Sequence, residues 1–442
     1  MSPGTGRRNE WLLVSFTGST SVADAIGTVA LPVLTLQFTQ SPMVITAVAA
    51  LRSAPWLVAA LHIGVFVDRM NRRTLMVGAE AARMLSIGAL LLAFLTDTLG
   101  VPLIMITALI LGLAEVFASL SGASIVPSAI PKGQRDRANT RITGVEYLCH
   151  GFVGAPIGGF LVAAGFAVAL GTITAVYVIG ALLLAMLVGN FAVSQTKQRG
   201  TVHGEIRDGL VFLWRHKLLR TMALLVTVMA GSWAVWYALI PVYAIKELGL
   251  SEEAYGFLLT CLGAGGITGV LLVQRVNKLL GRRWSMFVDI IGTAAMVGVP
   301  ALLPASPSSA WVIGAAAFVT GVGGTMWTVN SRVIQQALVP NEMLGRFSAA
   351  SRLVAWGMNP VAALIAGALA QLVSYRVAFG TFGVLCLLLV YPFLRVVTSE
   401  SVREVDSPDE PTDETPVKAV EDPTDPTPDS GQPAQAGATP VQ

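Results

Sequence analysis

The residues of this sequence that could do chemistry are a few ionisable side chains inside long apolar runs. Asp24 lies 13 residues into the first run and Glu115 lies 13 residues into the fourth, which places each about 20 Å from a helix end. If these runs cross a membrane, each charge costs about 2.5 kcal/mol or more unless it is paired or hydrated. A carboxylate kept at that depth can exchange protons with both sides, so we expect Asp24 and Glu115 to be proton-coupling residues.

Three further ionisable residues are candidates for the same role. Glu146 and His150 are four residues apart, and this spacing places them on one face of a helix. Arg52, in the second apolar run, reaches a depth similar to that of Asp24. In an alternative interpretation, Arg52 pairs with Asp24 as a fixed structural contact. Three other charged residues are nearer to helix ends and are interpreted as structural: Glu80, Arg83 and Asp289.

The apolar runs that carry these residues indicate the class of protein. Of the 442 residues, 54% are hydrophobic and 12% are charged, which is typical of a polytopic membrane protein. A spanning helix needs about 20 mostly apolar residues, and polar turns divide the sequence into twelve such runs. Their approximate bounds are 11–38, 43–66, 74–96, 102–127, 139–164, 167–190, 219–245, 253–275, 284–304, 310–331, 347–371 and 376–397. Three cysteines inside these runs share no metal-ligand spacing, so we expect no disulfide and no metal site: Cys149, Cys261 and Cys386.

The order of the runs predicts two halves. A polar segment, residues 191–218, separates six runs over 11–190 from six runs over 219–397. Pro131 and Pro340 are 209 residues apart, Pro156 and Pro360 are 204 apart, and a pair of arginines at 72–73 recurs 210 residues later. These nearly constant offsets predict a duplicated six-helix unit. Two such halves around a cavity, with a substrate site near the middle of the membrane, form a transporter architecture.

Charge predicts the orientation. Lys and Arg gather on alternate connections, which predicts that both termini are cytoplasmic in a plasma membrane protein, starting with residues 1–10. The segment 398–442 has eleven acidic residues against two basic ones and almost no large apolar residues. It is predicted to be a disordered, Pro-rich cytoplasmic tail.

The turn between the second and third runs carries a motif. It reads Gly64-Val-Phe-Val-Asp68-Arg69-Met-Asn71-Arg72-Arg73 and resembles the major facilitator superfamily signature Gly-x-x-x-Asp-Arg-x-Gly-Arg-Arg, except at Asn71. We interpret Asn71 as tolerated because Asn visits left-handed backbone angles. A basic turn that only sets topology is the alternative. The resemblance implies gating contacts made by five residues: Gly64, Asp68, Arg69, Arg72 and Arg73.

A second motif lies in the fifth run, with Gly154, Pro156, Gly158 and Gly159. It resembles the superfamily's antiporter motif Gly-x-x-x-Gly-Pro-x-x-Gly-Gly, with Ala155 between Gly and Pro as a departure. The resemblance implies an exporter of the twelve-helix drug and macrolide branch. Close helix packing with no bearing on direction is the alternative.

Aromatic and amide residues in the second half are candidates for lining a substrate cavity: Trp233, Trp236, Tyr237, Trp327, Asn330, Trp356 and Asn359. Apolar walls with a few polar groups suit a lipophilic ligand, and lipid-facing packing is the alternative. No ATP-binding loop and no zinc motif occurs in the sequence. We therefore expect no cofactor, and a proton gradient as the energy source.

The sequence thus predicts an all-α membrane protein with twelve transmembrane helices in two pseudo-symmetric six-helix bundles. We expect proton-coupled efflux of amphipathic small molecules such as drugs by alternating access, and no enzymatic activity. The expected partners are a small lipophilic substrate and membrane lipids, without nucleic acid, and the resemblance implies a monomer. An importer or a lipid or siderophore transporter of the same fold is the first alternative. A membrane scaffold or sensor that does not transport is an alternative of another class.

Overall fold

The computed structural model describes residues 3–59, 62–63, 67, 70–189, 191, 202–340 and 343–398, and every regular element among them is a helix. Three residues of the predicted gating motif, Gly64, Asp68 and Arg69, lie outside the described residues, as does the predicted tail from residue 399 onward. The prediction of an all-α protein is confirmed for the part of the chain that is described.

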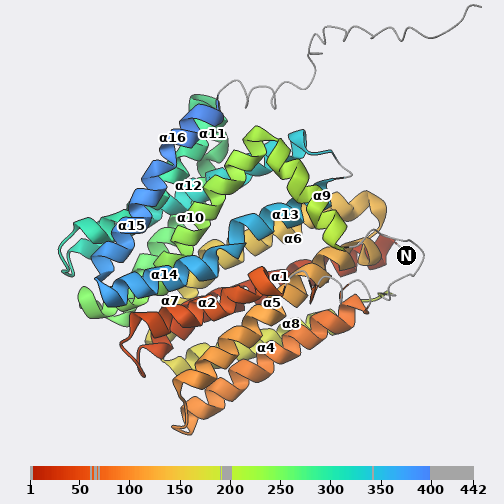
Figure 1. The fold of residues 1–442 in the computed structure, drawn as a ribbon. Helices are drawn as coiled ribbons and strands as arrows, with labels where there is room; N and C mark the ends of the chain where they lie inside the picture. The colour runs from red at the N-terminus through yellow and green to blue at the C-terminus, as the bar shows by residue number, and fades with distance from the viewer. Residues whose placement is uncertain are drawn as a thin grey trace, which may run out of the picture. The chain divides into compact units, whose positions relative to one another are not determined.

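The helices of the first half lie together in red to yellow in Figure 1. They are α1 (Pro3–Thr35), α2 (Pro42–Val58), α4 (Arg72–Leu95), α5 (Val101–Ala129), the 3₁₀ turn η1 (Lys132–Gln134), α6 (Arg135–Tyr147), the π-helical η2 (Leu148–Val153), α7 (Gly154–Ala164) and α8 (Phe166–Ala185). The helix α9 (Val202–Arg215) follows and precedes the second half.

The helices of the second half are drawn in green to blue in Figure 1. They are α10 (Lys217–Val242), the π-helical η3 (Tyr243–Glu247), α11 (Glu252–Leu302), α12 (Ser309–Leu338), α13 (Leu344–Gly357), α14 (Asn359–Leu372), α15 (Tyr375–Leu388) and α16 (Val390–Val396).

Ten of the described helical segments are long and apolar enough to cross a membrane, and α2 is a shorter apolar helix of 17 residues. The 51 residues of α11 would extend about 76 Å as one helix, more than twice the bilayer core of about 30 Å. Its backbone is not helical at Gly281, where φ is 80° and ψ is 160°. Gly281 therefore divides α11 into two helical segments. The count of twelve stays a prediction, which these helices accommodate if α11 is divided there and α2 is included.

The first helix begins at Pro3, earlier than the predicted start at residue 11. Asn9 Nδ2 donates hydrogen bonds to the carbonyl oxygens of Ala129 at 3.0 Å and Val188 at 2.8 Å. The buried carboxylate of Glu10 forms ion pairs with Arg137 at 2.7 Å and Arg141 at 2.9 Å. These contacts hold the first turns of α1 against the rest of the first half, so the polar segment at the start of the chain is helical.

The start of α4 corrects the interpretation of Asn71. This residue has an extended backbone, with φ −63° and ψ 118°, so the explanation based on left-handed angles is wrong. Its side chain accepts hydrogen bonds from the backbone N–H groups of Arg73 at 3.0 Å and Thr74 at 3.3 Å. Asn71 is the N-cap of α4, a position that favours Asn because its side chain satisfies exposed helix donors.

The two halves meet along pairs of helices. Ser41 Oγ, at the start of α2, donates a hydrogen bond of 2.8 Å to Gln371 Oε1 at the end of α14. A second pair is α7 and α11, where a Cβ added to Gly159 of α7 would lie 2.6 Å from the Cα of Gly256 in α11. This backbone-to-backbone approach is typical of membrane helices, which pack through small residues.

Candidate functional site

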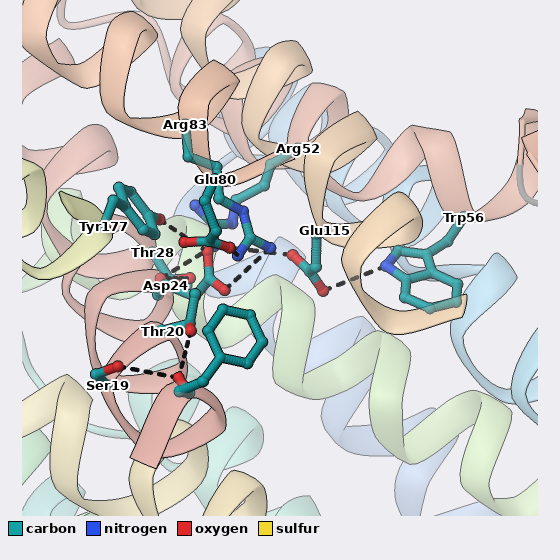
Figure 2. A network of polar contacts seen from close by, with 11 residues as sticks. Ser19, Thr20, Asp24, Thr28, Arg52, Trp56, Glu80, Arg83, Glu115 and Tyr177 are labelled. Atoms are coloured by element: carbon teal, nitrogen blue, oxygen red, sulfur yellow. Dashed lines mark hydrogen bonds and ion pairs between the residues drawn. The ribbon is translucent and has the colours of Figure 1, made fainter. Parts of the chain in front are cut away.

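Asp24, in the middle of α1, is the centre of a polar cluster in the first half, shown in Figure 2. The residue is 6% exposed, and three other helices contribute partners to its carboxylate. Arg52 Nη2 of α2 lies 3.2 Å from Oδ1, and Arg83 Nη2 of α4 lies 3.3 Å from Oδ2. The hydroxyl of Tyr177 in α8 donates a hydrogen bond of 2.9 Å to Oδ1. Asp24 therefore joins four helices of one half.

Two more carboxylates extend the cluster. Glu80 Oε1 lies 2.8 Å from Arg83 Nη1, and Glu80 is completely buried. Glu115 Oε2, in α5, lies 3.8 Å from Arg52 Nη2, and its Oε1 accepts a hydrogen bond of 3.2 Å from the indole N–H of Trp56. We name five of these residues the charged network: Asp24, Arg52, Glu80, Arg83 and Glu115.

The charged network does not balance its own charge. When all five groups are ionised it holds three carboxylates and two guanidinium groups, which leaves one negative charge in excess. An uncompensated charge away from water is costly, so the network can lower its energy by taking up one cation. The side chain of Glu115 is 31% exposed, whereas that of Asp24 is 9% exposed and that of Glu80 is fully buried. Glu115 is therefore the acid of the network that another molecule can reach.

Small residues make room for these buried charges. A Cβ added to Gly112 of α5 would lie 2.0 Å from the carbonyl oxygen of Arg52, so α2 and α5 touch at this residue. A Cβ added to Gly27 of α1 would lie 3.2 Å from Arg52 Nη1. That Nη1 atom is buried and has no hydrogen-bond partner among the described residues. The close packing of α1, α2 and α5 thus fixes the Arg52 side chain between the two acids that it contacts.

Glu146 and His150 are placed differently from the charged network. Glu146 lies in α6 and His150 in the π-helical η2, and both are half-buried. A π-helical turn has i→i+5 hydrogen bonds, so the four-residue spacing does not guarantee a shared face here. His150 lies within electrostatic range of Asp24. Their part in proton coupling stays a prediction.

The described arginines of the gating motif contact their own half. Arg72 Nη1 donates a hydrogen bond of 3.3 Å to Ser128 Oγ at the end of α5. Arg73 donates to the carbonyl oxygens of Leu184 and Ala185 at the end of α8. These bonds join the ends of α4, α5 and α8, and gating contacts between the halves stay a prediction.

The glycine motif of the fifth run packs against both halves. A Cβ added to Gly154 would lie 2.5 Å from the Cβ of Ala25, the residue after Asp24, and one added to Gly158 would lie 3.0 Å from the Cα of Ile26. Gly159 faces α11 through Gly256, and Pro156 faces the same helix, because a Cβ added to Gly263 would lie 2.9 Å from the Pro156 ring. The motif thus connects the Asp24 segment of α1 to the second half.

The predicted substrate-cavity residues lie in separate places. Trp236 is fully buried and stacks edge-on against Tyr237, with ring centroids 5.4 Å apart, and Trp233 lies 6.1 Å from the same ring. Trp327 packs on Phe393 in a separate apolar cluster.

The other amide and aromatic candidates differ in exposure. Asn330 is buried and pairs with Asn277 through two amide hydrogen bonds of 2.8 and 3.1 Å. Trp356 is 45% exposed near the end of α13, and Asn359 begins α14. Of the predicted cavity residues, only the three aromatic residues of α10 thus form a cluster of their own.

Four members of the site were not predicted as site residues: Glu80 and Arg83, which we interpreted as structural, and Tyr177 and Trp56. Glu80 and Arg83 are three residues apart, a spacing that indicates an ion pair on one helix face. We placed both near a helix end and interpreted them as structural, and the structure adds that Arg83 contacts Asp24 directly. Tyr177 and Trp56 give no signal of their own in the sequence, since single aromatic residues are common in membrane helices.

The comparison with protein families agrees with this architecture. Residues 13–358 and 225–428 match the family model of the Major Facilitator Superfamily. The chain belongs to the Major Facilitator Superfamily. It is therefore a multi-pass membrane transporter and not an enzyme, as predicted.

Individual relatives are similar over most of their length. The chain is 27% identical over 398 residues to the multidrug efflux pump Tap of Mycolicibacterium fortuitum, an alignment that covers 87% of this chain and 94% of that protein. The structure of a bacterial homologue of the iron transporter ferroportin in an inward-facing state matches with a TM-score of 0.67 and 16% identity, covering 90% of this chain and 100% of that chain. The peptide transporter POT matches with a TM-score of 0.67 and 14% identity, covering 90% of this chain and 95% of that chain. These likenesses confirm the predicted fold.

Proposed function

We propose that this transporter exports lipophilic small molecules, cationic ones in particular, and that a proton gradient drives the export. The similarity to a multidrug efflux pump over nearly the whole of both chains supports export of drug-like compounds. The distribution of Lys and Arg supports a plasma membrane orientation with both termini in the cytoplasm. We also propose that the transporter works as a monomer, which its resemblance to the family implies.

The observation that carries this proposal is the excess negative charge of the network together with the exposure of Glu115. A substrate with a protonated amine or a quaternary nitrogen supplies the missing positive charge when it pairs with Glu115. The Trp56 ring beside this carboxylate offers an aromatic face, and aromatic faces attract organic cations by about 0.5–2 kcal/mol. An acid beside an aromatic ring suits a cation with an apolar body.

The other charged groups of the network position this acid. Arg52 lies between Asp24 and Glu115, so it holds Glu115 from one side while Trp56 holds it from the other. Because two guanidinium groups already contact Asp24, a substrate cation has no vacant position at that carboxylate. This arrangement supports a structural role for Asp24 and a binding role for Glu115.

The test is ethidium accumulation in an efflux-deficient bacterial host that expresses the full chain. We expect the wild type to lower ethidium accumulation. At equal membrane abundance, Glu115→Gln should reduce the efflux rate by roughly tenfold, which corresponds to about 1.4 kcal/mol. The control is Glu253→Gln, an exposed acid of the second half outside the network, which should export ethidium as the wild type does.

The possible results test the export of drugs and the binding role of Glu115 separately. If the wild type does not lower the accumulation of ethidium or of any lipophilic drug in a panel, export is contradicted. If Glu115→Gln exports ethidium normally while Asp24→Asn does not, the binding role belongs to Asp24 and the argument from exposure is wrong.

A further inference from the structure

Asp289 is a buried acid of the second half that the charged network does not include. It lies in α11 beyond the break at Gly281 and is 4% exposed. Thr293 Oγ1 donates a hydrogen bond of 3.2 Å to its Oδ1. Within the described part of the chain, no Lys, Arg or His forms an ion pair with Asp289, and its Oδ2 accepts no hydrogen bond.

The helices packed around Asp289 present neutral groups to it. From α12, a Cβ added to Gly323 would lie 2.5 Å from the Cα of Asp289, and one added to Gly324 would lie 3.7 Å from its Oδ1. From α10, the indole N–H of Trp233 donates a hydrogen bond of 3.3 Å to the same Thr293 hydroxyl. The glycines bring the α12 backbone so close that this helix has no side chain there to pair with the acid.

The remaining neighbour is α15, which contributes Cys386. Its Sγ lies 3.1 Å from Ser232 Oγ of α10 and is within electrostatic range of Asp289. Among the described residues of α10, α12 and α15, this thiol is the one titratable group in range of Asp289. The carboxyl of Asp289 is therefore a lone acid among neutral partners.

The duplication shows which residues of the first half correspond to this cluster. Asp289 follows Glu80 by 209 residues, the same offset that relates Pro131 to Pro340. The same offset of 209 residues relates three further pairs of residues, one from each cluster: Asp24 and Trp233, Glu115 and Gly324, and Tyr177 and Cys386. The contacts support this correspondence. Asp24 contacts α4, the helix that carries Glu80, and Trp233 contacts α11, the helix that carries Asp289. The two clusters are thus built on equivalent positions of the repeat.

The cations of the first half have no counterparts in the second. At the same offset, Arg52 corresponds to Cys261 and Arg83 to Gly292. The second half has therefore kept one acid of the repeat without either of the guanidinium groups that surround the acids of the first half. An acid in this setting has two ways to lower its energy: contact with water, or binding of a proton.

We propose that Asp289 carries the proton that drives transport, while the charged network of the first half binds the substrate; this inference rests on the proton-coupled export proposed above. When the site is open to the side of higher proton concentration, the Asp289 carboxylate takes up a proton from that side, because no other cation is at hand. When the cavity opens to the other side and water reaches Oδ2, the proton is released. Protonation is thereby linked to the change of conformation, which is what couples a gradient to transport.

The experiment uses the purified full-length protein in liposomes with ethidium as substrate and pyranine as an internal pH indicator. Two activities are measured: ethidium accumulation driven by a pH gradient with the accompanying proton movement, and ethidium exchange without any gradient. For Asp289→Asn we expect gradient-driven accumulation and proton movement to fall at least tenfold, while exchange stays within twofold of the wild type. An Asp24→Asn protein that still exchanges ethidium should still move protons.

Three other results would also decide whether Asp289 carries the proton. If Asp289→Asn retains proton movement, the inference is overturned while the proposed function stands. If the wild type transports ethidium without moving protons, the proposed proton coupling fails and the inference fails with it. If Asp289→Asn also loses exchange, Asp289→Glu decides, because return of both activities with a restored carboxyl supports the inference and their absence overturns it.

Discussion

The two halves of this transporter bury polar groups in opposite ways. In the first half, five charged residues from four helices contact one another around Asp24. In the described part of the second half, apart from the acid Asp289, buried polar contacts join neutral groups. An example is the amide pair of Asn277 and Asn330, to which Ser285 adds a third partner at 3.2 Å from Asn330. For the duplicated unit that the sequence offsets predict, this difference indicates that helix packing can be kept while the chemistry at equivalent positions diverges.

The difference has an energetic consequence. Removing one member of a buried charged network leaves its partners as unpaired buried charges. The resulting loss of stability is larger than the contribution of the contact itself. Removing one member of a neutral pair leaves a smaller desolvation cost. Substitutions at the charged positions of the first half should therefore destabilise the protein more than substitutions at the equivalent positions of the second half.

The largest effect is expected for Arg83→Ala. It leaves Asp24 without one ion-pair partner and Glu80 without any, in a fully buried setting, and should lower the free energy of unfolding by about 3–5 kcal/mol. Thermal unfolding in detergent, followed by size-exclusion fluorescence, measures this. Arg376→Ala is the control, because this exposed arginine of the second half donates one hydrogen bond to the Leu303 carbonyl and should contribute less than about 0.5 kcal/mol.

A double variant sharpens the same test. Arg83→Met combined with Glu80→Gln removes both charges of the pair and should recover part of the lost stability, since a buried ion pair can be replaced by neutral groups at little cost. Equal melting temperatures for Arg83→Ala and the wild type would show that the network does not hold the helices.

An intermediate effect is expected at the equivalent positions Tyr177 and Cys386. Tyr177→Phe removes a hydrogen bond to a charged carboxylate and should cost about 1.5–3 kcal/mol. Cys386→Ala removes a contact between a thiol and the Ser232 hydroxyl, for which about 1 kcal/mol is expected. The same unfolding assay compares the two, and a larger loss for Cys386→Ala would reverse the comparison between the halves.

The smallest effect is expected from removing the tail. Val397 and Phe393 are completely buried, so packing of the second half extends to Val397. A chain that ends at Thr398 should export ethidium within about twofold of the full chain, a change of about 0.4 kcal/mol. A chain that ends at Leu388 lacks both buried residues and should lose activity. Loss of function in the chain that ends at Thr398 would favour the sensor alternative.

The fold could be predicted because each of its main signals can be recognised from the sequence without knowing which helices touch. The length of each apolar run, the positions of Lys and Arg and the repeat offset each depend on neighbouring residues or on spacing alone. Helix ends were less predictable: α1 starts at Pro3 because Glu10 pairs with Arg137 and Arg141, residues more than a hundred positions away.

The site could be predicted only in part, for a geometric reason. Counting residues gives the depth of a side chain in the membrane, and depth brought Asp24, Arg52 and Glu115 together as candidates. It does not give the direction in which a side chain points around the helix axis, which decides whether Arg83 meets Asp24. The same limit applied to Asp289, whose neighbours became apparent only when α10, α12 and α15 were seen around it.

The glycine break in α11 also bears on how the protein is made. As the chain leaves the ribosome, Gly281 is followed by Arg282 and Arg283, which the distribution of Lys and Arg predicts to stay on the cytoplasmic side. The apolar segments before and after them then enter the bilayer as a helical hairpin. The backbone angles at Gly281 are accessible almost only to glycine. A bulkier residue there would favour one continuous helix longer than a membrane is thick, so we expect this position to affect membrane insertion as well as the final structure.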